Sequence, residues 1–321
     1  MLAIRRFLQV IATGYILMFF SENLFWARLR PDNSVSDWLA TWTAYSLAAY
    51  IFLWIISYFR IRSFWALFLA GAVFGWTIEG IIETTTYESL PLQISWTGLA
   101  WHASISAMVG WYAIRMALQK KSALHTLRIA SLIGFCYGIW AIYWWIEPDD
   151  GGKATIAEFA AYSLVATILS LLAYRLYNWA AVENYTPGLP GRIIVGLITL
   201  LYFVFVTIKA APVALPILPG LLLLTYITLR RNKEIETEDS ILSEKPKPVA
   251  IWNYLALFAI PLIAIAFYSI AYYANLRWYT NWVLYIITTP LGFILFAVSI
   301  YKIMKKRPTD SCPDLSSDYQ I

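Results

Sequence analysis

The sequence predicts an all-α, polytopic integral membrane protein, a bundle of about ten transmembrane helices arranged as five hairpins. Three observations predict this class. The composition is 60% hydrophobic and only 13% charged, whereas soluble domains carry roughly 25% charged residues. Apolar runs of about 20 residues recur along the chain, and each is long enough to cross a hydrocarbon core of roughly 30 Å. Finally, lysine and arginine are distributed unevenly between successive connecting segments.

Polar breaks divide the apolar sequence into the expected helices. The first apolar run resembles a signal peptide, but it lacks a small-x-small cleavage site and continues past Glu22, so we interpret it as an uncleaved span. The expected spans are 7–27, 38–58, 64–84, 96–118, 129–147, 156–178, 193–210, 213–229, 251–274 and 280–301.

Two polar segments define the organisation of the chain. The stretch RRNKEIETEDSILSEKPKPV carries charges of both signs and few large apolar residues, which is typical of a flexible linker. The C-terminal segment is similarly polar and is expected to be disordered. We therefore expect a bundle of four helical hairpins over 1–229, a cytoplasmic linker over 230–250, a transmembrane hairpin over 251–303 and a cytoplasmic tail over 304–321.

The basic residues predict the orientation. If the N-terminus is cytoplasmic, the outer segments hold only a minority of the 24 lysines and arginines. Cytoplasmic loops of membrane proteins are enriched in these residues, so both termini are predicted to be cytoplasmic, in a plasma (inner) membrane. The net charge of +5 is then a topology signal, and no nucleic-acid partner is expected. The basic residues on the outer side are Arg28, Arg30, Lys153, Lys209 and Arg277.

Short similar motifs suggest a duplicated two-helix unit. AYSLAAY at 44–50 resembles AYSLVAT at 161–167, and both lie in returning helices. Three outgoing helices end with a glutamate near a tryptophan, in SENLFWA, GWTIEGIIE and YWWIEP. The spacing of these ends is about 60 residues, which is compatible with a hairpin repeat. Short apolar motifs also coincide by chance in membrane chains, so both explanations stay open.

Ionisable residues within the spans are the candidates for chemistry. A charged side chain at mid-membrane costs roughly 2.5–3.5 kcal/mol to insert, and Glu22 and Glu79 are the most demanding placements. Glu79 and Glu83 are spaced i, i+4 and share a helix face. His102 lies between Trp96 and Trp101. These residues are expected to come from the outer halves of neighbouring helices.

We expect an outward-facing, acidic and tryptophan-rich cavity that binds a substrate. Glu158 and Lys209 are further candidates for it. The alternative is that each acid caps a helix or reaches the outer surface, and that the tryptophans form an interfacial belt. The residues expected to line the cavity are Glu22, Glu79, Glu83, His102, Glu147, Trp26, Trp76, Trp101 and Trp144.

Several chemistries find no support in the sequence. The chain has two histidines, His102 and His125, so a histidine-rich metal centre is excluded. Cys136 and Cys312 fall in a span and in the tail, which argues against a disulfide. Neither a phosphate-binding G-x-x-x-x-G-K-[ST] loop nor an H-E-x-x-H or G-x-S-x-G motif occurs. No cofactor and no metal are expected.

Three functions fit these features. The first is a secondary carrier or binder of a cationic or amphipathic small molecule, with acids and aromatic rings forming the contact surface. The second is an intramembrane enzyme that modifies a lipid or polyprenyl substrate by Glu/His acid–base chemistry. The third is a structural or assembly protein with no small ligand. Membrane lipids are the expected partners in each case, and a small molecule or lipid is the expected substrate in the first two.

Overall fold

The computed structural model describes residues 1–306 except 31–32, 147–152 and 237. The secondary structure of this part of the chain is all helical, without strands. Nine of its helical segments are long and apolar enough to cross a membrane, so the predicted all-helical, multi-pass class is confirmed. They are Leu2–Asn23, Val35–Tyr58, Phe64–Ile82, Ala123–Trp145, Ile156–Ala180, Leu189–Ala210, Ala214–Ile235, Ile251–Tyr273 and Thr280–Lys305.

The expected span at 96–118 is helical but is not one of these nine. It is built from α4 (Leu92–Ser95), η4 (Trp96–Ile114) and α5 (Arg115–Leu118), which follow one another without a break. Serines, tryptophans and His102 lower the hydropathy of this segment relative to the other spans. Most of its polar side chains are nonetheless buried or half-buried, because neighbouring helices surround it.

Three helical segments contain π-helical turns at the positions of the candidate residues. α1 (Leu2–Met18) continues into η1 (Phe19–Asn23), α3 (Phe64–Thr77) continues into η2 (Ile78–Ile82), and η4 is π-helical throughout. π-helical turns are rare and frequently occur at functional sites. A π turn also changes the side-chain spacing, so the faces expected from α-helical periodicity shift beyond it.

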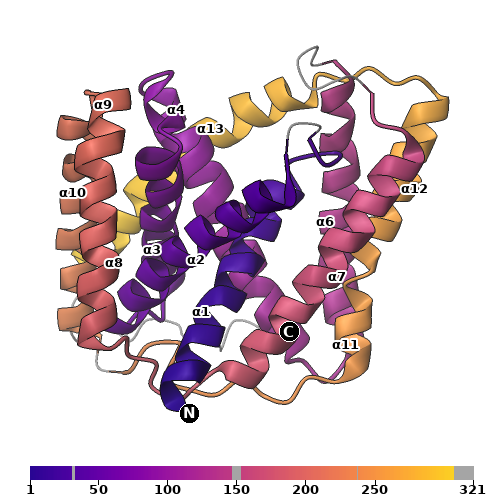
Figure 1. The fold of residues 1–321 in the computed structure, drawn as a ribbon. Coiled ribbons are helices and arrows are strands. Elements are labelled where there is room, and N and C mark those ends of the chain that lie inside the picture. Colours follow the sequence, from indigo (N-terminus) through magenta and orange to yellow (C-terminus); the bar gives the residue numbers. More distant parts are fainter. Residues whose placement is uncertain (31–32, 147–152, 237, 307–321) are drawn as a thin grey trace.

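Helix packing brings segments from distant parts of the sequence together (Figure 1). α1 packs on α2 (Val35–Tyr58) and on α7 (Ile156–Ala180), and α3 packs on η4. α12 (Ala259–Tyr273) packs on both α6 (Ala123–Ala141) and α7, while α13 (Thr280–Lys305) packs on η4 and α3. The core is densest along α3, where 89% of the spanning window is buried.

Glycines allow the close contact between α3 and η4. A Cβ added to Gly75 would overlap the carbonyl oxygen of Gly98, and one added to Gly71 would lie 3.0 Å from Cα of Ala103. The G-x-x-x-G spacing of Gly71 and Gly75 therefore serves close helix approach. This approach places His102 of η4 beside Glu79 of η2.

Two of the long helices begin with a capping box. Ser34 precedes α2 and exchanges side-chain and backbone hydrogen bonds with Asp37. Thr155 precedes α7 and does the same with Glu158. A capping box satisfies two backbone donors of the first helical turn, so the Glu158 carboxylate is engaged in holding the start of α7.

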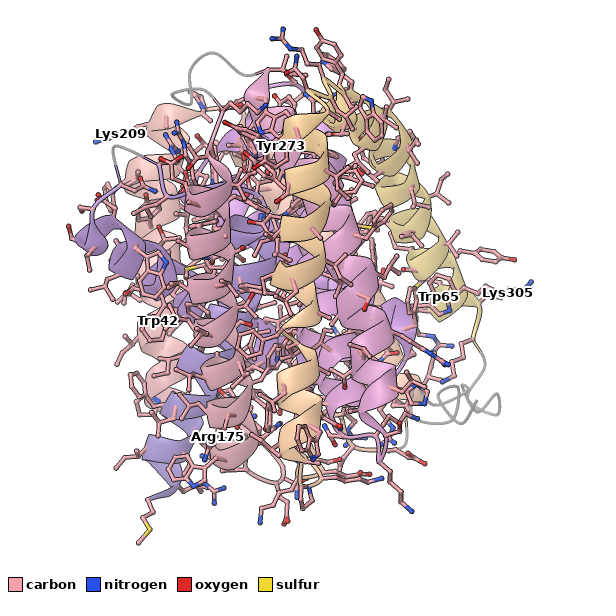
Figure 2. All side chains as sticks on the ribbon, turned by 90° about the vertical axis from the view of Figure 1, so that its right-hand side faces the viewer. Trp42, Trp65, Arg175, Lys209, Tyr273 and Lys305 are labelled. Carbon is pink, nitrogen blue, oxygen red and sulfur yellow. The ribbon has the colours of Figure 1, made fainter. Side chains whose placement is uncertain are left out.

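The two ends of the bundle differ in charge. We call the end at which α1 begins the basic end, and the end at which η1 and η2 lie the acidic end; Arg175 lies toward the former and Lys209 toward the latter (Figure 2). α10 (Ala214–Ile235) extends beyond residue 229, where the expected span ends. The connection after it is held to the basic end by backbone hydrogen bonds, including Ile241 N–H to the Ile61 carbonyl at 3.0 Å.

Candidate functional site

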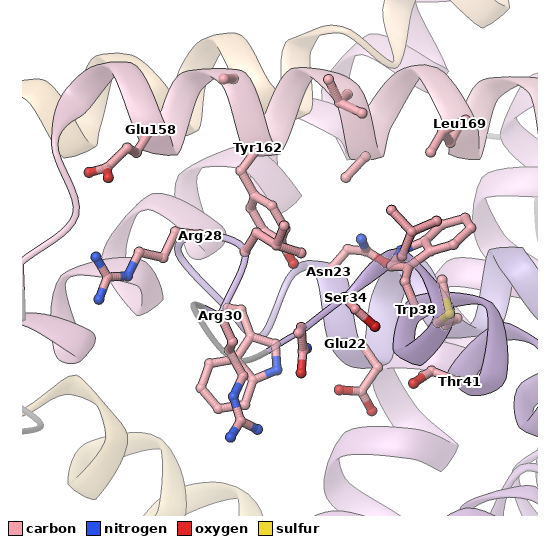
Figure 3. A pocket seen from close by; sticks show the side chains of 18 residues that line it. Glu22, Asn23, Arg28, Arg30, Ser34, Trp38, Thr41, Glu158, Tyr162 and Leu169 are labelled. Atoms are coloured by element: carbon pink, nitrogen blue, oxygen red, sulfur yellow. The ribbon is translucent and has the colours of Figure 1, made fainter. Parts of the chain in front are cut away.

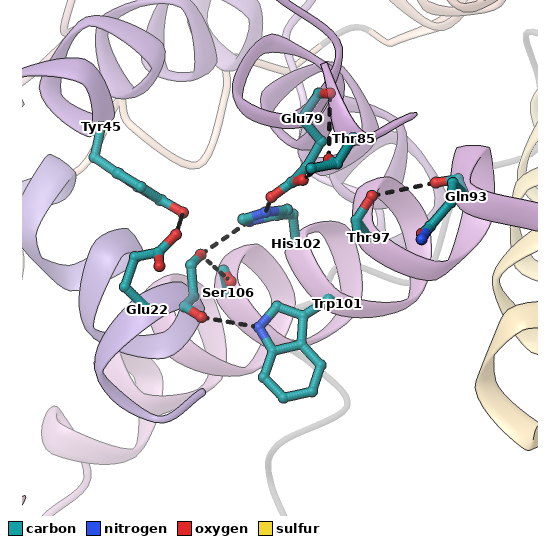
Figure 4. A network of polar contacts seen from close by, with 10 residues as sticks. Glu22, Tyr45, Glu79, Thr85, Gln93, Thr97, Trp101, His102 and Ser106 are labelled. Atoms are coloured by element: carbon teal, nitrogen blue, oxygen red, sulfur yellow. Dashed lines mark hydrogen bonds and ion pairs between the residues drawn. The ribbon is translucent and has the colours of Figure 1, made fainter. Parts of the chain in front are cut away.

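A buried hydrogen-bonded chain centres on His102. Its Nε2 lies 2.6 Å from Oε1 of Glu79, and its Nδ1 lies 2.9 Å from Oγ of Ser21 (Figure 4). The three side chains come from η4, η2 and η1, and all three residues are buried. Both ring nitrogens of the histidine therefore have a partner, and neither partner is adjacent to it in sequence.

The hydrogen-bonded chain Glu79–His102–Ser21 can hold its protons in two arrangements. With Glu79 ionised and His102 neutral, Nε2–H donates to the carboxylate and the Ser21 hydroxyl donates to Nδ1. When His102 is protonated, Nδ1–H donates to Ser21, and the Ser21 hydroxyl turns to Ser106, 2.7 Å away. Both states keep every link of the chain satisfied, which is the requirement for a low-cost proton shift in a dry interior.

The carboxylate–imidazole–hydroxyl order resembles the logic of a catalytic triad. Ser21 is only 3% exposed, however, and its hydroxyl is already paired with Ser106. A nucleophile must reach its substrate, so this arrangement does not favour Ser21 as one. This hydrogen-bonded chain is better suited to holding η1, η2 and η4 in fixed positions and to moving a proton between their side chains.

The turn after η2 holds Glu79 from the other side. Thr85 donates a hydrogen bond to Oε2 of Glu79, so both carboxylate oxygens are engaged. The hydroxyl of Tyr87 donates to the Gly80 carbonyl at 2.7 Å. Burial raises the pKa of Tyr87 to about 12, which keeps this phenol a neutral donor.

A second carboxylate, Glu22, lies next to this chain. It follows Ser21 directly in η1, and its Oε1 accepts a hydrogen bond from the Tyr45 hydroxyl at 2.7 Å. The Tyr45 ring lies 6.2 Å from the His102 ring, centroid to centroid. Glu22 and Glu79 thus lie on either side of one small group of polar and aromatic side chains (Figure 4).

Glu22 also faces a pocket of about 740 Å³ at the acidic end (Figure 3). The pocket lies between η1, the start of α2 and the N-terminal half of α7, beside the loop that joins α1 to α2. Val35 and Val165 in its lining are 78% and 56% exposed, so the pocket opens on the side of the bundle. Other lining residues are Met18, Asn23, Trp26, Arg28, Leu29, Arg30, Asn33, Ser34, Trp38, Thr41, Glu158, Ala161, Tyr162, Ala166 and Leu169.

An aromatic cluster supports the loop beside the pocket. Trp26 stacks on Trp144 at 4.3 Å, and the indole N–H groups of Trp140 and Trp144 both donate to the Phe25 carbonyl at 2.6 Å. Trp101 donates to the Ser21 carbonyl at 3.2 Å. Through the backbone of residues 21–26, these contacts connect the pocket wall to the hydrogen-bonded chain of His102.

The predicted acidic residues fall into different places. Glu22 lines the pocket, whereas Glu79 and His102 lie behind it and bind each other. Glu83 is exposed at the acidic end. Glu147 lies outside the described residues, so its predicted position stays a prediction.

The predicted tryptophans are similarly divided. Trp26 lines the pocket, and Trp101 and Trp144 bind the backbone beside it. Trp76 points elsewhere: it is fully buried, donates to the Ile94 carbonyl at 3.0 Å and packs on Phe296. It therefore supports the contact of α3 with α4 and α13.

Four hydroxyl side chains of the site were not predicted from the sequence. Ser106 follows His102 by four residues, and Ser21 precedes Glu22, so both had a weak local signal. Tyr45 lies in the AYSLAAY motif, and Thr85 lies in a turn. Their roles depend on contacts between helices, which no local pattern shows.

No protein-family model, curated protein or solved structure matches this chain. Among the described residues, no group of three or more His, Cys, Asp or Glu side chains is placed to hold a metal ion.

Proposed function

We propose that this chain is a membrane-embedded enzyme that performs acid–base chemistry on an amphipathic, lipid-like substrate, with Glu22 as the proton-transferring group. One observation carries the proposal. The Glu22 carboxyl both lines the 740 Å³ pocket and lies against the hydrogen-bonded group that contains Glu79 and His102. A general acid or base needs contact with substrate on one side and a fixed position on the other.

The shape of the pocket supports a substrate that enters from the lipid phase. Its wall contains Met18, Val165 and Leu169, and it opens between two spans rather than only toward the end of the bundle. Arg28 and Glu158 at the rim provide charged groups for a polar head. An apolar wall with a few polar groups is the usual construction of a small-molecule site.

The local geometry suits proton transfer by Glu22. Tyr45 donates to Oε1, and the Trp26 side chain is a second hydrogen-bond partner of the carboxyl. A carboxylate can accept about four hydrogen bonds, so it can still exchange a proton with a substrate in the pocket. The Tyr45 hydrogen bond stabilises the carboxylate form and fixes its orientation. Trp26 and Trp38 line the same pocket, and their ring faces stabilise positive charge on a bound substrate.

A proton-coupled carrier is the second candidate, and one observation favours it. The Glu79–His102 pair is buried and can change its protonation state without losing its hydrogen bonds. Such a pair is a common device for coupling solute movement to protons. The enzyme ranks first because the pocket described here contacts Glu22 and not this pair.

Thermal-shift measurements on the detergent-purified protein test the proposal. The probes are simple amines, phospholipids, isoprenoid alcohols and polyprenyl phosphates, each at two pH values, with Glu22→Gln as the site variant and Glu88→Gln as the matched control. Glu88 is exposed at the same end of the bundle and outside the pocket. We expect an amphiphile to raise the Tm of the wild type and of Glu88→Gln, with a smaller shift in Glu22→Gln.

The same measurement separates the alternatives. Stabilisation by water-soluble amines alone would favour the carrier and contradict the lipid-like substrate. An equal shift in Glu22→Gln and wild type would contradict the role of Glu22 in the pocket, and no shift with any probe would contradict both candidates.

A further inference from the structure

A second hollow, of about 490 Å³, lies at the basic end of the bundle. It is formed where the end of α2, the start of α8 (Leu189–Tyr202), the end of α10 and the connections around Asn184 and Ser240 meet. It shares no lining residue with the pocket at the acidic end. Its lining residues are Trp54, Ser57, Tyr58, Arg60, Asn184, Tyr185, Thr186, Pro187, Arg192, Lys233, Asp239, Ser240 and Ser243.

Three cations from separate segments converge on this hollow. Arg60 follows α2, Arg192 is in α8 and Lys233 is in α10. Within the described part of the chain, none of the three has a carboxylate oxygen within 4.0 Å. Asp239 also lines the hollow, so the lining carries three positive side chains and one negative one.

Other cations at the same end do have carboxylate partners. Arg62 pairs with Glu238 at 3.2 Å, and Lys245 pairs with Glu183 at 3.3 Å. An excess of positive charge is expected at a cytoplasmic end, and other cations there, such as Arg5 and Arg6, bind backbone or hydroxyl oxygens. Arg60, Arg192 and Lys233 differ from these in lining one cavity together.

The three cations are held in place by other means. Nη1 of Arg60 donates to the Glu236 carbonyl at 3.4 Å. Nζ of Lys233 lies 3.7 Å from the centroid of the Tyr58 ring, and Cζ of Arg192 lies 6.0 Å from that of Trp54. Nε of Arg192 is a buried donor without an acceptor in the described structure, as are those of Arg5, Arg6 and Arg115. An oxygen of a ligand in the hollow would supply the acceptor that buried donors normally have.

Arg60 is placed beside the hollow by the end of α2. Its φ of 51° is the left-handed conformation that ends many helices. Ile61 N–H bonds to the Ile56 carbonyl at 3.0 Å, and Arg60 N–H bonds to the Ser57 carbonyl at 3.4 Å. This turn ends α2 and brings Arg60 into the lining of the hollow.

We propose that this hollow binds the phosphate of an anionic phospholipid headgroup. Phosphate matches three convergent cations, since Arg forms bidentate contacts with its oxygens and Lys acts as a point charge. A lipid is favoured over a soluble phosphate by the position of the site. α8, which carries Arg192, has no buried residue, so acyl chains can lie along its apolar surface below a headgroup held at its start. Basic pockets at the cytoplasmic ends of spans are known to bind such headgroups.

The test measures lipid binding to the full chain in neutral detergent by thermal shift and by native mass spectrometry. The probes are phosphatidylglycerol, phosphatidylcholine and glycerol phosphate. The site variant is Arg192→Gln/Lys233→Gln. The control variant, Arg175→Gln/Lys302→Gln, removes two exposed charges outside the hollow, so that the net charge of the two variants is equal. The charge-conserving variant Arg192→Lys/Lys233→Arg checks folding.

We expect the wild type and the control variant to retain phosphatidylglycerol in preference to phosphatidylcholine. The affinity for phosphatidylglycerol should fall at least tenfold in the site variant and largely return in the charge-conserving one. Equal loss in site and control variants would overturn the proposal in favour of general electrostatic attraction. Stabilisation by glycerol phosphate as strong as by the lipid would overturn the lipid assignment in favour of a soluble phosphate. These outcomes do not depend on whether the acidic-end pocket is catalytic.

Discussion

The charged side chains at the two ends of the bundle differ in the partners that the protein gives them. At the acidic end, Glu22 and Glu79 each have partners from the chain itself, in Tyr45, His102 and Thr85. At the basic end, Arg192 and Lys233 of the hollow have aromatic neighbours and Arg60 donates to a backbone carbonyl, but none of the three has a carboxylate within 4.0 Å in the described structure. Under the two proposals, the acids serve chemistry because partners within the protein hold them in place. The cations serve ligand binding because they have no carboxylate partner within the protein.

The largest expected effect on turnover comes from removing the charge of Glu22, which lines the pocket and lies next to the hydrogen-bonded chain of His102. Glu22→Gln keeps the size of the side chain and an oxygen that can accept from Tyr45, so the fold should persist. Loss of a general acid or base lowers turnover by about 10²–10⁴-fold. Turnover of the amphiphile identified by thermal shift is the measurement, with Glu88→Gln as the control. An undiminished rate in Glu22→Gln would show that the proton comes from another group.

Substitutions of Glu79 test whether its hydrogen bonds stabilise the acidic end. Glu79→Leu leaves Nε2 of His102 unpaired and leaves the Thr85 hydroxyl only the backbone carbonyl of residue 79, at 3.5 Å. Removing one partner of a buried pair costs roughly 3–5 kcal/mol. Glu79→Gln can still accept from Thr85 and donate to His102 if the imidazole changes its tautomer, so its cost should be about 1 kcal/mol.

Unfolding of the purified protein by denaturant in mixed micelles compares the two Glu79 variants. Turnover should fall in both variants, because each removes the carboxylate from the hydrogen-bonded chain of His102. Equal stability of Glu79→Leu and Glu79→Gln would mean that the hydrogen bonds of Glu79 do not hold the site together.

Glycine variants separate close packing from helix propensity. Gly75→Ala places a methyl group against the Gly98 carbonyl and 2.9 Å from Cβ of His102, which should cost about 1–3 kcal/mol. Gly220→Ala in α10 meets no atom within 4 Å and should be neutral or stabilise by up to about 1 kcal/mol. The Tm of each variant is the measurement, and a Gly75→Ala protein as stable as Gly220→Ala would contradict the close contact of α3 with η4.

Among the variants that change turnover, the smallest expected effect is that of Tyr45→Phe. It removes one hydroxyl, and with it the hydrogen bond to Glu22, while the ring keeps its packing on Phe74. A single hydrogen bond to a charged group contributes about 1.5–3 kcal/mol, and part of this is recovered because Glu22 can turn toward the pocket. We expect turnover to fall by about tenfold, a difference of roughly 1.4 kcal/mol, with little change in Tm. A rate equal to that of the wild type would show that Tyr45 does not position Glu22.

The class of the protein was predictable because it depends on local composition. Long apolar runs specify helices that can span a membrane wherever they occur, and nine such helices are present in the described chain. The segment around His102 was expected as a span from its length, but its polar residues make it less apolar than the others. Its burial depends on packing against α3 and α13, which the sequence does not show.

The candidate site was predictable in its ionisable groups and not in its connections. Glu22, Glu79 and His102 were recognisable because each is costly within an apolar run. Ser21 and Tyr45 carry no such cost, so nothing in the local sequence distinguishes them from other hydroxyl side chains. Trp76 was expected in the same cavity as Glu79, yet it packs on Phe296. That contact depends on the position of α13, which the sequence around Trp76 does not show.

The most direct test of the account is solvent proton transfer to a lipid-like substrate. Purified protein is incubated in D₂O with isoprenoid alcohols, polyprenyl phosphates and phospholipids, and deuterium bound to carbon is measured by mass spectrometry. We predict incorporation into one class of amphiphile by the wild type and by Glu88→Gln, and a loss of at least 100-fold in Glu22→Gln. Incorporation by Glu22→Gln at the wild-type rate would contradict acid–base catalysis at Glu22, and none by the wild type with any probe would contradict proton transfer between Glu22 and a substrate carbon.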